Sequence, residues 1–421
     1  MPTIINNQYK TDSTRRNIGV KSLNIFRNNY FSLLFIIFLL VSSINSSLLI
    51  SKGQNSSQQT KEGSFQINDY IETEFISTYP ENSWGMRSNG FALREDNVYT
   101  IIGQNPTVLD VSNKSNPTFV AEYEAPDGRF NDLVLQEDLL YVGSNYGLEI
   151  MNISNLNNIR KIGEFDTVDA VYQLIIQNDL VYLAAGSNGM IILNVSNPGQ
   201  PLELGCYDNN GNVWGVTIRE SIAFVCDVQQ SLVIVNISNL SNPVEISQYD
   251  EPEFEHDHYD DLPAYTVAVN GSYAYVACNY WGLQIFDINN LSNPLKMGMF
   301  YGGEGLPGDD IDESTLDIYL KEDYAFVSAY ENGLRILDVS DPTHPLEIGS
   351  FTEFGDVRYV DVQNDYAYLQ TIDYGLMILE LTYYSSNPSA GITGFTFLPA
   401  FTGFFVLLVI IPIIRSYRKK N

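Results

Sequence analysis

The stretch from Ser231 to Pro243 reads SLVIVNISNLSNP, and it decides the fold of this chain. Its unbroken run of Val, Ile and Leu is typical of a strand buried on both faces, and the Asn, Ser and Pro residues after it end that strand in a turn. Seven copies of one unit identify a repeat protein. The other copies are TVLDVSNKSNP from Thr107, LEIMNISNLNN from Leu148, MIILNVSNPGQP from Met190, LQIFDINNLSNP from Leu283, LRILDVSDPTHP from Leu334 and a shortened LMILEL from Leu376.

Each copy belongs to a unit of four short predicted strands. In the third unit these are VYQLII (171–176), LVYLAA (180–185), MIILNV (190–195) and LELGCY (202–207). Four strands in about 42 residues are typical of one blade of a β-propeller, and a β-helix solenoid would need shorter repeats. We therefore predict an all-β fold, a seven-bladed propeller of four-stranded blades. An aromatic residue in the second strand marks the blades with spacings of 42, 41, 42, 51, 51 and 42, at Tyr99, Tyr141, Tyr182, Phe224, Tyr275, Phe326 and Tyr368.

The last unit lacks a fourth strand, because Leu381 runs directly into TYYSSNPS. A matching segment, DYIETEFIS at 69–77, stands ahead of the first unit and resembles the fourth strands PTFVAEYE (117–124) and PLEIGSFT (345–352). Pairing the two ends of the array removes the exposed edge that an open ring would leave. We predict that Tyr70–Phe75 complete the seventh blade.

The phrases LVIVNIS, LRILDVSDP and LQIFDIN, together with YVA-type strands and glycines ahead of such phrases, resemble the LVIVD-repeat family of surface β-propellers. The resemblance extends roughly from Tyr70 to Leu381. It implies a propeller at the cell surface and supplies no general catalytic residues. The sequence departs from the family phrase where Asp is replaced, at Asn152, Asn194, Asn236 and Glu380.

Both ends of the chain carry apolar segments. Residues 1–50 combine basic residues, an apolar run and small polar residues, which is typical of a secretory signal peptide or, if uncleaved, of an N-terminal anchor. Residues 391–414 contain no charge and precede a basic tail, 415–421, so we expect a transmembrane helix with its tail in the cytoplasm. A plain anchor and a processed sorting signal both fit this end.

With linkers at 51–63 and 385–390, the propeller is expected to span residues 64–384 outside the cytoplasm, at the cell surface or plasma membrane. The chain has 51 acidic and 22 basic residues among its 421 and a net charge of −29, so we expect no nucleic-acid partner. No GxSxG, HExxH or phosphate-binding glycine-rich loop occurs, which weakens the case for an enzyme. Three dispersed cysteines, Cys206, Cys226 and Cys278, are interpreted as small buried residues.

A polar residue follows the third strand of each of the first six units. A short polar side chain at such a position caps the following turn through the backbone, and we prefer this structural role to that of a ligand. These residues are Asp110, Asn152, Asn194, Asn236, Asp287 and Asp338.

The two long spacings come from acidic insertions, DEPEFEHDHYDDLP (250–263) and YGGEGLPGDDIDES (301–314), between a fourth strand and the next first strand. In a propeller these connections lie on one face, at the mouth of the channel. Clustered carboxylates repel one another unless they are solvated or bridged by a cation; oxygen ligands suit Ca²⁺, and added histidines suit Zn²⁺ or Mn²⁺. Solvated acidic loops are the alternative. The candidate metal ligands are Glu255, His256, Asp257, His258, Asp260, Asp261, Asp310 and Asp312.

Aromatic and charged residues at the starts of inner strands, or in a turn on the same face, are predicted to share this mouth. Such a mixture can hold a sugar or peptide by stacking and hydrogen bonding, with packing between blades as the alternative for the tryptophans. The candidate ligand-binding residues are Trp214, Tyr265, Trp281, Asp132, Asp317 and Arg358.

The sequence favours a membrane-anchored, outward-facing propeller that acts as a binding or adhesion module for a protein, peptide or glycan. One alternative is an extracytoplasmic, metal-assisted hydrolase or lyase that uses the carboxylates at the channel mouth. The other is a structural component of the cell envelope.

Overall fold

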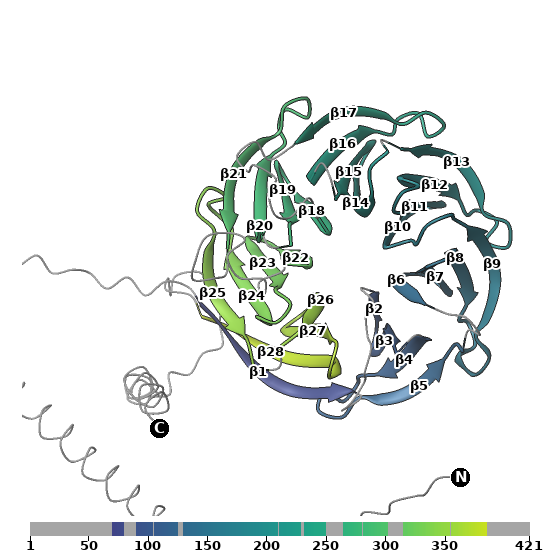
Figure 1. The fold of residues 1–421 in the computed structure, drawn as a ribbon. Coiled ribbons are helices and arrows are strands. Elements are labelled where there is room, and N and C mark those ends of the chain that lie inside the picture. The colour runs from purple at the N-terminus through teal and green to yellow at the C-terminus, as the bar shows by residue number, and fades with distance from the viewer. Residues whose placement is uncertain are drawn as a thin grey trace, which may run out of the picture. The chain divides into compact units, whose positions relative to one another are not determined.

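The computed structural model describes residues 70–384 apart from 80–89, 104, 125–128, 209, 229–230, 250–263, 280, 302–314 and 354. The described residues form seven four-stranded antiparallel sheets, arranged as blades around a central axis (Figure 1). Their only helix is a single 3₁₀ turn, Leu156–Asn158. The prediction of an all-β propeller with seven four-stranded blades is confirmed.

In each blade the strands follow one another from the axis outward, and each set below gives blades one to seven in order (Figure 1). The inner strands are β2 (Phe91–Arg94), β6 (Phe130–Gln136), β10 (Gln173–Gln177), β14 (Val213–Arg219), β18 (Thr266–Asn270), β22 (Asp317–Lys321) and β26 (Val357–Gln363). The second strands are β3 (Asn97–Ile102), β7 (Leu139–Ser144), β11 (Leu180–Ala184), β15 (Ile222–Asp227), β19 (Tyr273–Ala277), β23 (Tyr324–Ser328) and β27 (Tyr366–Thr371). The third strands are β4 (Asn105–Asp110), β8 (Gly147–Asn152), β12 (Met190–Asn194), β16 (Ser231–Asn236), β20 (Leu283–Asp287), β24 (Leu334–Asp338) and β28 (Gly375–Tyr384). The outer strands are β5 (Thr118–Glu122), β9 (Arg160–Asp166), β13 (Leu202–Tyr207), β17 (Val244–Tyr249), β21 (Leu295–Phe300), β25 (Leu346–Phe351) and β1 (Tyr70–Tyr79).

The seventh blade is built from both ends of the repeat array. Strand β1 pairs antiparallel with β28, with Tyr70 opposite Tyr384 and Phe75 opposite Leu379. Figure 1 shows the purple β1 lying along the yellow β28. The predicted closure by Tyr70–Phe75 is therefore confirmed, and the strand continues to Tyr79.

The hydrophobic core lies between neighbouring blades. The opening phrase forms β16, and its Leu232, Val233, Ile234 and Val235 are fully buried, as expected of a strand covered on both faces. One cluster joins Tyr182 and other residues of the third blade to residues of the fourth, and six further clusters repeat this arrangement around the ring. Each blade is thus stabilised mainly by burial against its neighbours.

The polar residue predicted to cap the exit turn is the last residue of the third strand in the first six blades, and it does cap that turn. Its side-chain oxygen accepts a hydrogen bond from the backbone N–H two residues later, over 2.8 Å at Asp110 and 3.0 Å at Asn152. The same bond recurs at Asn194, Asn236, Asp287 and Asp338. The repetition of this residue type therefore reflects turn geometry.

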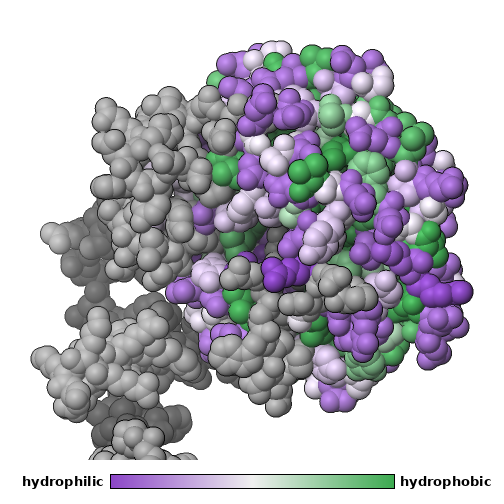
Figure 2. All heavy atoms as spheres, turned by 45° about the vertical axis from the view of Figure 1, so that its right-hand side comes forward, coloured by the Kyte–Doolittle hydropathy of each residue, from purple (hydrophilic) through white to green (hydrophobic). Residues whose placement is uncertain are grey.

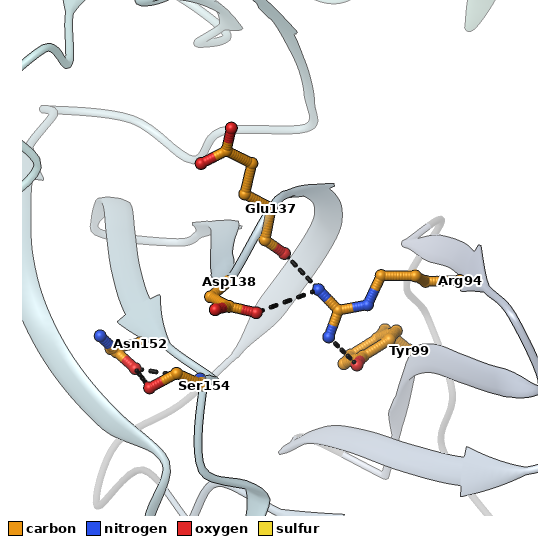
Figure 3. A network of polar contacts seen from close by, with 6 residues as sticks. All are labelled: Arg94, Tyr99, Glu137, Asp138, Asn152 and Ser154. Carbon is orange, nitrogen blue, oxygen red and sulfur yellow. Dashed lines mark hydrogen bonds and ion pairs between the residues drawn. The ribbon is translucent and has the colours of Figure 1, made fainter.

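We call the face on which the inner strands begin the upper face, and the face on which they end the lower face. On the lower face, Arg94 at the end of β2 donates to Tyr99 Oη over 2.8 Å, to Asp138 and to the backbone carbonyl of Glu137 in the next blade (Figure 3). Glu137 occupies a tight turn with a left-handed φ of 50°.

Four other blades make the equivalent side-chain bond to a left-handed turn residue of the next blade. These donor–acceptor pairs are Gln136 to Asn178, Arg219 to Gly271, Asn270 to Glu322 and Lys321 to Asn364. Hydrogen bonds from one blade to the next therefore accompany apolar packing on the lower face.

The predicted signal or anchor at 1–50, the linkers at 51–63 and 385–390, the helix at 391–414 and the tail at 415–421 lie outside the described residues. Within the described part of the chain, no helix has the length and apolar character needed to cross a bilayer.

Removing β1 should open the ring. A chain that starts at residue 80 loses the whole β1–β28 ladder and exposes the edge of β28 and its buried Leu379 and Leu381. We expect a large drop in melting temperature or loss of the cooperative transition in circular dichroism, whereas a chain that starts at residue 64 should melt like the full-length protein. Equal melting of the two shortened chains would contradict closure by β1.

Candidate functional site

A cavity of about 290 Å³ lies at the channel, lined by residues from the inner-strand segments of all seven blades. Each blade contributes because the inner strands run side by side around the axis (Figure 1). Its lining includes Phe91, Asp132, Gln173, Trp214, Thr266, Asp317 and Tyr359.

Most of the polar lining residues occupy one equivalent position of the repeat, at or near the start of the inner strand. Strand pairing places Asp132, Gln173, Thr266, Asp317 and Tyr359 at this position in blades two, three, five, six and seven. We call this position the channel position.

The other two blades carry glycine at the channel position. A Cβ on Gly90 would lie 2.6 Å from Leu133 N, and a Cβ on Gly215 would lie 2.4 Å from Tyr265 O. Because Gly215 has no side chain, Gln173 of the third blade reaches past the fourth blade and donates from Nε2 to Thr266 Oγ1 over 3.2 Å.

Side chains at the channel position also connect consecutive blades. Asp132 Oδ2 accepts a hydrogen bond from Leu174 N over 2.8 Å, and its Oδ1 accepts one from Leu133 N over 2.9 Å. Gln173 Oε1 accepts one from Val216 N over 2.7 Å. In each case an inner strand is held to the next one, a structural role that the sequence analysis missed for Asp132.

Asp317 repeats this arrangement between the sixth and seventh blades. Its Oδ2 accepts a hydrogen bond from Val360 N over 3.1 Å. Ser328 Oγ, which accepts from Asp317 N over 2.8 Å, donates in turn to Arg358 O over 3.0 Å. The two aspartates predicted as ligand contacts therefore also fix the spacing of the blades.

Burial changes the ionisation of these carboxyl groups. Loss of solvation raises the pKa of Asp132 to about 8 and that of Asp317 to about 7, although the backbone N–H donors act in the opposite direction. Further along β26, burial raises the pKa of Asp361 to about 6. Burial and then the nearby Asp317, Asp361 and Asp132 raise the pKa of Tyr359. The channel thus holds acidic groups that change charge near neutral pH.

An aromatic row stands one residue before the channel position in blades three, four and five. The rings of Tyr172 and Trp214 are stacked, with centroids 5.0 Å apart and planes 18° apart. Tyr265 meets Trp214 edge-on, with centroids 4.7 Å apart. Trp214 Nε1 donates to Asn212 Oδ1 over 3.0 Å, which helps fix the indole. All three rings remain partly exposed.

Four of the six predicted ligand-binding residues come together at the cavity, namely Asp132, Trp214, Tyr265 and Asp317. Trp281 packs instead against the core cluster of blades four and five, and the Arg358 guanidinium lies 5.4 Å from the centroid of the Tyr330 ring. Neither of these two lines the cavity. Trp281 thus has a packing role and the Arg358 guanidinium contacts an aromatic ring, and contact of either side chain with a ligand stays a prediction.

The sequence analysis missed Tyr172, Gln173, Thr266 and Tyr359. Aligning the starts of the inner strands would have found them, because AVYQ, NVWG, PAYT and DVRY place these residues at the same two positions as Trp214 and Asp132. The sequence signal for these residues was therefore their position in the aligned repeats and not an unusual residue type.

All eight predicted metal ligands, Glu255, His256, Asp257, His258, Asp260, Asp261, Asp310 and Asp312, lie outside the described residues. Within the residues that the structure does describe, no group of three or more His, Cys, Asp or Glu side chains is placed to hold a metal ion. None of the three cysteines forms a disulfide; Cys226 and Cys278 are buried as predicted, whereas Cys206 is exposed because it lies on the outer strand β13.

With this fold in place, comparison with protein families shows that the chain belongs to the LVIVD repeat family. Seven repeats match, at residues 98–125, 127–167, 171–209, 210–251, 263–301, 313–353 and 354–397. No curated protein matches the sequence.

Solved structures share the architecture at low sequence identity. The β-propeller domain of Cps50 (Swd1) from Myceliophteria thermophila is 10% identical, with a TM-score of 0.57 and coverage of 74% of this chain and 100% of that one. The WD40 propeller domain of Doa1 is 12% identical, with a TM-score of 0.56 and coverage of 74% and 97%. A chain of a mitotic checkpoint complex is 10% identical, with a TM-score of 0.55 and coverage of 79% and 97%. These similarities establish the fold alone.

The buried carboxyl groups should make the fold less stable as the pH rises. Their pKa values exceed the ordinary 3.8, so between about pH 4 and pH 8 the folded chain binds more protons than the unfolded one, and the free energy of unfolding falls. Asp317→Asn should flatten this dependence by on the order of 2–4 kcal/mol between pH 5 and pH 9.

The measurement is urea unfolding at several pH values. The matched control is Asp338→Asn, because Asp338 caps an exit turn in which other blades already carry Asn. A pH dependence that is the same in wild type and Asp317→Asn would contradict the raised pKa of Asp317.

Proposed function

We propose that this propeller is a binding module that holds a protein, peptide or glycan at the upper mouth of its channel. The observation that carries this proposal is the aromatic row of Tyr172, Trp214 and Tyr265, two of whose rings line a cavity that also contains polar side chains. Flat rings beside a few fixed hydrogen-bonding groups are typical of sites for sugars and peptides.

The rigidity of the site supports binding. The Asp132 and Gln173 side chains are held by backbone N–H donors, and the Trp214 indole is fixed by Asn212. A ligand therefore meets groups that are already oriented, so it costs little side-chain entropy to engage them.

The exposed surface also favours a local site over a broad contact. In the view of Figure 2, hydrophilic residues prevail and hydrophobic residues form only small separate patches. Among the coloured residues of this view, no large apolar patch of the kind that marks an extended protein interface is visible. A ligand would gain most of its binding energy at the channel mouth.

The proposal includes an extracytoplasmic location at the cell surface. It is supported by the signal-like pattern of residues 1–50, and by the uncharged segment 391–414 with the basic tail after it. Under this arrangement the propeller is tethered to the membrane and presents its channel mouth to ligands outside the cell.

Replacing Trp214 should weaken ligand capture without unfolding the ring, because the indole is partly exposed and lies at the mouth. Binding of the purified protein to glycan and peptide arrays is measured first, and each hit is then titrated by calorimetry. Loss of a central aromatic contact costs about 2 kcal/mol, so Trp214→Ala should weaken affinity roughly 30-fold. His344→Ala, in an exposed turn of the lower face, is the control. Hits that bind both variants equally would refute the proposed site.

A further inference from the structure

We infer that the cavity at the channel mouth receives a cationic group, and specifically the ammonium group of a lysine side chain presented by a peptide or protein partner. The inference rests on the proposed function and names the ligand class for that site. Its basis is the combination, in one cavity, of partly exposed aromatic rings and two carboxyl groups from separate blades.

The two carboxyl groups of the lining favour a cation, and they do so more strongly as they ionise. Asp132 comes from the second blade and Asp317 from the sixth, whose inner strands β6 and β22 lie across the channel from one another (Figure 1). Among the lining residues that the structure describes, none is Lys, Arg or His. An anionic group would meet both carboxyl groups in a chain with a net charge of −29, so phosphate, sulfate and acidic sugars are disfavoured.

Both carboxyl groups can accept further hydrogen bonds. A carboxylate offers about four lone-pair directions, and Asp132 receives two backbone donors, from Leu133 and Leu174. The amide of Gln173 is held by Val216 N and Thr266 Oγ1. An ammonium group, which has three donors and no acceptor, matches this excess of acceptors.

The aromatic row supplies the second half of the recognition. A cation placed within about 6 Å of an indole or phenol ring is attracted by the negative face of the ring. Trp214 and Tyr265 border the cavity at the same end of the channel as Asp132 and Asp317. A lysine side chain can therefore lay its methylene groups against the rings while its ammonium group reaches a carboxylate.

The size of the cavity fits a single side chain. At about 290 Å³ it lies just below the range of roughly 300–1,000 Å³ that is typical of sites for whole small ligands. The remainder of a peptide would lie over the upper face, and only the lysine would enter.

Binding of an ammonium group should release protons from the site. The cation favours the ionised carboxylates, and in the free protein Asp132 and Asp317 have pKa values of about 8 and 7. Asp361 and Tyr359 of β26 also lie close enough to Asp317 to interact with it electrostatically. Affinity should therefore rise with pH from 6 to 9, below the range in which lysine itself loses its proton.

The test uses the full-length chain and two neutral-ended pentapeptides, acetyl-Gly-Gly-Lys-Gly-Gly-amide and the same peptide with an acetylated lysine side chain. Calorimetry at low ionic strength is expected to show at least tenfold tighter binding of the lysine peptide. Its affinity should increase at least tenfold from pH 6 to pH 8.5. Trp214→Ala and Asp317→Asn should each abolish the preference for the charged peptide, and His344→Ala should retain it.

Equal affinity for the two peptides, or an affinity for the lysine peptide that does not rise with pH, would overturn the inference. Both readouts use the wild-type protein, so the test stands even if Asp317→Asn fails to fold. Trp214-dependent binding of a neutral glycan together with no preference for lysine would refute the cation and leave the proposed function intact. Absence of any Trp214-dependent ligand would refute both.

Discussion

The ring depends on hydrogen bonds that run from a side chain of one blade to the backbone of the next. Apolar packing between blades is strong but has little direction, and sheets packed face to face can slide. The bonds from Asp132, Gln173 and Asp317 set the register on the upper face, and those from Arg94 and its equivalents set it on the lower face (Figure 3). Strands β6, β10, β14, β22 and β26 are therefore held to a neighbouring blade at both ends, and this positioning shapes the channel.

Closure of the ring by β1 likewise fixes how the first and last blades lie against each other. Without β1 the edge of β28 would be unpaired, and an open array would leave the outer faces of its first and last blades uncovered. Because β1 completes the last blade, Phe91 of the first blade packs against Tyr359 and Tyr368 of the seventh, and Gln370 donates to Ile101 O over 2.9 Å. The cavity lining includes both Phe91 and Tyr359, so the site exists only in the closed ring.

Most of the scaffold could be predicted from the sequence, because each blade repeats the same signal. The buried phrase of β16, the capping role of Asn236 and the closing strand at Tyr70 all follow from local pattern and from the need to cover an edge. The site was predictable only in part. Asp132 and Trp214 could be predicted as site residues from their residue type. Their neighbours Gln173 and Tyr172 belong to the site because of their position in the ring. Contacts between residues about 42 positions apart, such as Asp132 with Leu174, appear only once the blades are aligned.

The channel position serves both the stability of the fold and the binding of a ligand, and these two requirements usually conflict. A carboxyl group buried as deeply as Asp132 costs stability, and its high pKa is a direct sign of that cost. An apolar residue there would avoid the free-energy cost of burying a carboxyl group. It would, however, leave Leu174 N without its acceptor and would remove an ionisable group from the cavity. Backbone N–H donors reduce the cost of each carboxyl group without neutralising it, so the group is held in place and can still accept a donor from a ligand. The same hydrogen bonds that align the blades therefore orient the acidic groups at the channel mouth, and this is why scaffold and site share residues.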